Sequence, residues 1–188
     1  MYQAMRKREV IKNTIYIIFI ALLAIIPTYY IYNKFQGDRN IDVNSESLDV
    51  TYHETTGDKV TLTKVTPVTD SVGLSSKAYL ITIKNNLTEK VDYKVKLIDD
   101  LEKIKEDLCS DKLISKESIK VSIKTNKTSN KIYYLNDLED DTLLVDTIDA
   151  LEKKNISIRV WIRQDSNIPS GSKLHYHGII KVIEEKNK

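Results

Sequence analysis

The sequence has few of the residues from which disulfide-rich exported domains and phosphate-binding loops are built. Its 188 residues include one cysteine, five glycines and three prolines. The single cysteine, Cys109, excludes an intrachain disulfide, so we expect packing to stabilise the fold. The glycines are scattered, and no G-x-S-x-G or H-E-x-x-H pattern is present. Without a catalytic motif, the chain is predicted not to be an enzyme and to take no cofactor.

Charge is missing from residues 15–32, which read IYIIFIALLAIIPTYYIY. About 18 to 20 helical residues cross a hydrocarbon core of about 30 Å, so residues 15–33 are predicted to be a transmembrane helix in the lipid bilayer. Basic residues precede this segment and tyrosines end it, which favours a cytoplasmic N-terminus and an extracytoplasmic C-terminal domain. The alternative is a cleaved secretory signal, although the segment has no A-x-A pattern at its end.

The anchor divides the chain into four predicted parts: a basic leader (1–14), the transmembrane helix (15–33), a polar stalk (34–47) and one extracytoplasmic domain (48–188). Five of the 29 basic residues and one of the 27 acidic residues precede Phe35, which leaves a formal net charge of −2 beyond it. A slightly acidic domain gives no electrostatic argument for a nucleic-acid partner. No small-molecule substrate is evident either.

Alternation of apolar and polar residues dominates the domain and predicts short, half-buried antiparallel strands. One segment, 99–110, instead spaces its apolar residues as a helix does, and Asp99 or Asp100 can cap it. The predicted fold is therefore mainly β: an antiparallel β-sandwich of jelly-roll or immunoglobulin-like type with one short surface helix. The expected strands lie near 48–52, 60–62, 79–83, 91–97, 119–123, 131–135, 143–145, 155–164 and 174–182.

The last two expected strands predict a closing hairpin. A simple register sets Trp161 opposite His175 and Arg159 opposite His177, on the face away from the core. One interpretation is that the 99–110 helix or a neighbouring loop covers Trp161 while its acids pair with the arginines. The other is that Trp161, Arg159 and Arg163 form a contact surface for a protein partner.

Two groups of residues could bind metal. His175 and His177 lie two residues apart on one strand face, so both imidazoles could reach one zinc or copper ion, with His53 or a carboxylate as a third ligand. The alternative is a pair of ordinary surface histidines. The acids Asp137, Glu139, Asp140 and Asp141 could bind calcium, but they lack EF-hand spacing, and a solvated acidic turn is the other interpretation.

Several short patterns between residues 76 and 184 occur in a characteristic order: ITIKNN, VDYKVKL, LNDLEDDTLLVDTIDAL, ISIRVWIRQD and HYHGIIKV. In this order the chain resembles the TasA/camelysin-like exported proteins of Gram-positive bacteria and their single-anchor relatives. The resemblance implies an extracytoplasmic sandwich of jelly-roll type with a structural or surface-assembly role. The chain departs from the family at its N-terminus, where a cleavable export signal is missing, and this departure argues against polymerisation by strand exchange.

Together these features predict a single-pass cell-membrane protein whose outer domain is a structural or protein-interaction module of the bacterial cell envelope. Its partner would be a protein at the cell surface. The alternative function is a sensory ectodomain that binds a ligand or, through His175 and His177, a metal.

Overall fold

The computed structural model describes residues 47–53, 56–106 and 112–185, all of which belong to one compact unit, Asn40–Lys188. The predicted leader, the predicted transmembrane helix (15–33) and all but the last residue of the predicted stalk lie outside these residues. No helix in the described ranges is both long and apolar enough to cross a membrane.

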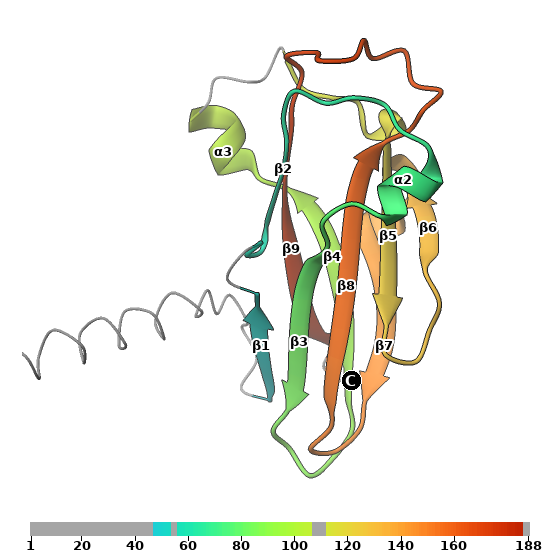
Figure 1. Cartoon of the computed structure of the whole chain (residues 1–188). Helices are drawn as coiled ribbons and strands as arrows, with labels where there is room; N and C mark the ends of the chain where they lie inside the picture. The colour runs from blue at the N-terminus through green and yellow to red at the C-terminus, as the bar shows by residue number, and fades with distance from the viewer. Residues whose placement is uncertain (1–46, 54–55, 107–111, 186–188) are drawn as a thin grey trace, which may run out of the picture. The chain divides into compact units, whose positions relative to one another are not determined.

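The described chain is mainly β, as predicted, and its strands form two antiparallel sheets (Figure 1). Sheet A has the order β1-β3-β8-β5-β6, and sheet B has the order β2-β9-β4-β7. The strands are β1 (Leu48–Tyr52), β2 (Lys59–Leu62), β3 (Tyr79–Asn85), β4 (Val91–Asp99), β5 (Ile119–Thr125), β6 (Lys131–Tyr134), β7 (Thr142–Ile148), β8 (Lys153–Ile162) and β9 (Tyr176–Glu185).

Strand pairing contradicts the predicted closing hairpin. β8 pairs with β3 and β5 in sheet A, whereas β9 pairs with β2 and β4 in sheet B. Trp161 therefore lies beside Lys120 of β5, and His177 lies beside Thr61 of β2. The connection 163–175 carries the chain from one sheet to the other across their ends (Figure 1). Alternation specifies which face of a strand is buried but does not specify its partner, and this is why the prediction was wrong.

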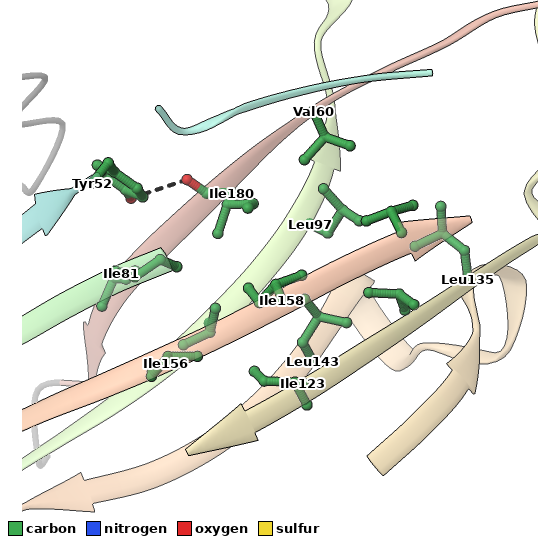
Figure 2. Close-up of a cluster of buried hydrophobic side chains, with 14 of the residues drawn as sticks. Tyr52, Val60, Ile81, Leu97, Ile123, Leu135, Leu143, Ile156, Ile158 and Ile180 are labelled. Carbon is green, nitrogen blue, oxygen red and sulfur yellow. Dashed lines mark hydrogen bonds between the residues drawn. The ribbon is translucent and has the colours of Figure 1, made fainter. Parts of the chain in front are cut away.

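The core forms between the two sheets, and the predicted phase of β8 is confirmed. Its even-numbered apolar residues Ile156, Ile158, Val160 and Ile162 are buried in one cluster with apolar residues of sheet B. Figure 2 shows side chains of this cluster from both sheets. The hydroxyl of Tyr52 on β1 donates a hydrogen bond of 3.0 Å to the carbonyl oxygen of Ile180 on β9 and so links the sheets.

Two short α-helices are present in the described residues, where the sequence predicted one. α3 (Leu101–Glu106) lies within the predicted segment, and Asp100 caps it by accepting a hydrogen bond of 3.0 Å from the backbone N–H of Lys103. α2 (Asp70–Leu74) was missed because five residues are too few to show a helical period. The described ranges also contain three 3₁₀ turns: η1 (Lys116–Ser118), η2 (Leu135–Asp137) and η3 (Glu139–Asp141).

A buried lysine also joins the two sheets. Lys154 of β8 is 5% exposed, and its Nζ lies 2.6 Å from Oδ2 of Asp146 on β7. The hydroxyl of Tyr93 on β4 donates a hydrogen bond of 3.2 Å to the same carboxylate. Burial, reinforced by the Asp146 charge, raises the pKa of the Tyr93 hydroxyl. Burial also opposes the charge of Asp146, but the hydrogen bonds from Lys154, Thr147 and Tyr93 outweigh it and lower the pKa of this carboxyl.

Candidate functional site on the outer face of sheet A

The strand pleat gives sheet A an outer face of polar side chains. Along β8 the odd-numbered residues alternate with the buried even-numbered ones, so Lys153, Asn155, Ser157 and Arg159 share the face away from the core. The registers add Leu80, Thr82 and Lys84 from β3 and Lys124 from β5. These residues are far apart in the sequence, and only the sheet brings them together.

An open groove of about 550 Å³ lies on this face. Its lining contains a lysine, an arginine, three asparagines and two hydroxyl side chains, but no acidic residue. The lining residues are Leu74, Leu80, Lys124, Thr125, Asn126, Asn130, Asn155, Ile156, Ser157 and Arg159. Such a lining favours a polar ligand that carries negative charge.

Helix α2 lies over the upper part of the same face, where it covers Trp161 (Figure 1). A Cβ atom on Gly73 would lie only 2.3 Å from Cδ2 of Trp161, so the helix backbone approaches the indole closely because this residue is glycine. Asp70, at the start of the helix, bonds to the same indole and to a lysine of β5. Its Oδ1 accepts a hydrogen bond of 3.3 Å from Nε1 of Trp161, and Lys120 donates to both of its oxygens at 2.9 Å.

Hydrogen bonds hold two side chains of the groove in place. Arg159 donates from Nε to the carbonyl oxygen of Ser76 at 3.0 Å and from Nη1 to Oγ of Ser157 at 3.1 Å. Thr82 donates from its hydroxyl to Oδ1 of Asn155 at 2.9 Å. These bonds position the guanidinium at the groove, where no described residue gives it an acidic partner, and so preorganise a positive charge for a ligand.

Below the groove, Lys84 and Lys153 lie directly opposite each other on β3 and β8, and both are exposed. Like charges in this arrangement destabilise a sheet. Asp49 of β1 is the acidic neighbour of Lys84 in the register. Within the described ranges, no carboxylate lies at ion-pair distance from Lys84, Lys124, Lys153 or Arg159. The lower face thus carries an uncompensated positive charge.

The predicted contact residues Trp161, Arg159 and Arg163 all lie on this face, but Trp161 is only 4% exposed. The covering element is α2, whereas α3, the described part of the predicted 99–110 helix, lies against β9 of the other sheet. Arg159 bonds to Ser76 and Ser157 instead of an acid, while Arg163 forms an ion pair with Asp165 at 3.2 Å. The structural interpretation of Trp161 therefore fits this arrangement, and Arg159 is the member of the group that reaches the groove.

The predicted metal pair lies at the other sheet, where His177 is in β9 and His175 directly precedes that strand. The rings of His175 and His177 have centroids 5.8 Å apart, and His177 is 3% exposed while His175 is half-buried. Among the residues that the structure describes, no group of three or more His, Cys, Asp or Glu side chains is arranged to hold a metal ion. Metal binding by the pair stays a prediction.

The acidic turn is engaged by lysines. Asp140 forms an ion pair with Lys96, and Oδ1 of Asp141 lies 3.0 Å from Nζ of Lys116. The hydrogen bond from Lys96 and its charge lower the pKa of the Asp140 carboxyl. These two carboxylates thus balance lysines of the protein itself, in agreement with a solvated acidic turn.

Sequence reasoning missed most residues of the groove. No sequence motif surrounds its polar residues. Lys124 and Asn155 are polar positions in strands of alternating polar and apolar residues, and Asn130 follows a turn. What these residues share is that they lie together on one face without an acidic residue among them. This can be recognised only when the strand register is known.

No family model matches the chain, and no curated protein or solved structure shows significant similarity to it. The resemblance to TasA/camelysin-like proteins consequently stays a prediction from sequence patterns. The argument for function depends on the face of sheet A itself.

Proposed function

We propose that the chain is a membrane-tethered binding module of the cell envelope, with the outer face of sheet A as its binding surface. The observation that carries the proposal is the groove with its positioned Arg159, its exposed Lys124 and no acidic lining residue. The fixed charge is oriented before any ligand arrives, so less entropy is lost on binding. The proposal assigns the chain no catalytic step.

The strand pairing supports a jelly-roll type for this module. β2 pairs with β9, β3 with β8, β4 with β7 and β5 with β6, so eight strands form one long antiparallel ribbon whose tip is the β5–β6 connection. The ribbon folds over so that alternate pairs fall into different sheets, which is the winding of a double-sheet jelly roll. β1 extends sheet A beside β3.

The sequence supports the tether. Residues 15–32 carry no charge, and Arg6, Lys7, Arg8 and Lys12 precede them. In the proposed arrangement these residues stay in the cytoplasm, the apolar segment spans the bilayer, and the β domain is presented outside. A surface that holds a ligand then connects this ligand to the membrane.

Labelling of the full-length chain in intact cells tests this arrangement. In a Cys109→Ala background, Lys153→Cys places a thiol on the exposed outer face of sheet A, and Lys7→Cys places one in the predicted cytoplasmic leader. A membrane-impermeant maleimide should label Lys153→Cys in intact cells and Lys7→Cys only after lysis. The reverse pattern would overturn the topology, and recovery of the protein in the soluble fraction would overturn the tether.

A further inference from the structure

We propose that the groove of sheet A binds an anionic chain of hydroxyl-rich units, an acidic glycan or a polyol phosphate. This inference rests on the proposed function, because it assigns a ligand class to the same surface. Its starting point is charge: Lys124 and Arg159 line the groove and no acidic residue does. An anion bound there meets cations that no carboxylate of the described chain neutralises.

The spread of the cations favours a chain over a single ion. Lys153 and Arg159 lie six positions apart along β8, which corresponds to about 20 Å of extended strand. Lys124 lies beside Ser157 of β8, between these two levels. One phosphate or carboxylate can lie between Lys124 and Arg159, because Nη1 of Arg159 bonds to Ser157 beside Lys124, but it cannot also reach Lys153. A ligand with negative charges repeated along its length can contact all of them at once, and each contact then adds to the same binding event.

The remaining polar groups match hydroxyls. Asn126, Asn130 and Asn155 each carry amide N–H donors and a carbonyl acceptor, and Ser157 carries a hydroxyl. Oδ1 of Asn155 already accepts from Thr82, so its amide N–H groups stay available as donors. Groups that both donate and accept pair equally well with hydroxyls of either orientation. A ligand of charge alone, without hydroxyls, would accept from their donors but would leave the acceptor oxygens of Asn126 and Asn130 unused.

Other ligand classes fit this surface less well. The groove has no aromatic lining residue on which a nucleic-acid base could stack. A peptide that adds a strand needs a sheet edge, whereas β8 pairs on both sides with β3 and β5. Leu74, Leu80 and Ile156 are its apolar lining residues, too few for an apolar ligand.

Titration of the purified full-length chain in detergent tests the ligand class. The two anionic probes are a galacturonate hexamer, which carries carboxylates, and a glycerol-phosphate hexamer, which carries phosphates. A neutral sugar hexamer and hexaglutamate are the comparisons. We expect at least one anionic hydroxyl-rich probe to bind, and binding to weaken when the salt is raised from about 50 to about 500 mM. The preferred probe identifies the source of the anion.

A pair of double variants locates the site. Lys124→Gln with Lys153→Gln removes two exposed cations of sheet A, and we expect affinity to fall about tenfold because two exposed charge contacts are lost. Lys94→Gln with Lys181→Gln removes the same charge from the outer face of sheet B and should change affinity by less than about twofold.

Three results would overturn the inference. These are the absence of binding by both anionic probes, equal binding of hexaglutamate, or an equal loss of affinity in the sheet B variant. The measurement uses purified protein and is independent of membrane topology. A failed titration with correct cell-surface labelling would therefore reject the ligand class alone, whereas failed labelling would reject the tether alone.

Discussion

The outer faces of the two sheets use lysine in different ways. On sheet B, Nζ of Lys94 lies 2.5 Å from Glu185, Lys96 forms an ion pair with Asp140, and Lys59 lies 3.8 Å from Asp100. On the lower part of sheet A, the structure shows no ion pair for Lys84, Lys124 or Lys153 among the residues it describes. On the sheet B face, Lys181 likewise has no ion pair among the described residues.

This difference shows that the formal charge of a β domain says little about where its charge is available. The paired lysines of sheet B are neutralised by carboxylates of the protein itself. Each exposed pair stabilises the fold by only about 0–1 kcal/mol. Among the described residues, Lys84, Lys124 and Lys153 on the lower part of sheet A form no such pair, although Lys120 on the upper part of the same face pairs with Asp70. Lys84 and Lys153 even lie directly opposite each other, where like charges repel. A face with unpaired lysines is a better candidate for a binding surface than a face whose lysines are already paired with carboxylates.

The largest expected effect concerns the covered part of sheet A. Trp161→Ala removes a buried indole from beneath α2 and should lower the free energy of unfolding by about 3–5 kcal/mol. Denaturant unfolding of the full-length chain measures it. Unchanged stability would show that Trp161 is not part of the packed structure. Gly73→Ala provides a second test. The new methyl group would clash with the indole and lower stability, and this loss should disappear when Trp161→Ala is already present.

A smaller effect separates two adjacent lysines on opposite faces of β8. Lys154→Ala leaves Asp146 and Tyr93 without their cation, and we expect a loss of about 2–4 kcal/mol in unfolding free energy. Lys153→Ala is the matched control, and an exposed lysine without an ion pair should change stability by less than about 0.5 kcal/mol. Equal effects of the two substitutions would contradict the register of β8.

The smallest effect is a pH dependence at Asp146. The pKa of this carboxyl is lower in the folded chain than in the unfolded one, so its contribution is complete above the unfolded pKa and is lost as pH falls through the folded value. Stability should therefore decrease as pH falls below about 4, by at most about 1 kcal/mol from this partly exposed group. Thermal unfolding of Asp146→Asn should show a shallower decrease than the original chain. An identical decrease would argue against the Lys154 contact.

Much of the fold was predictable because burial in a strand depends on local alternation. The pattern of Ile156, Ile158 and Val160 predicts the buried face of β8, and the structure confirms it. The spacing in 99–110 and the capping by Asp100 predict α3. α2 could not be predicted, since its five residues are stabilised by packing on Trp161 and by the bonds of Asp70 and not by their own period.

The sequence alone determined the mainly β class, the antiparallel character of the strands and the inward face of the strongest strand, because these follow from neighbours along the chain. Only the tertiary structure decided that β8 and β9 lie in different sheets, since pairing depends on contacts between residues far apart in the sequence. The same holds for the groove. Lys124 and Arg159 are separated by more than thirty positions, and the pairing of β5 with β8 is the physical reason that they act on one surface.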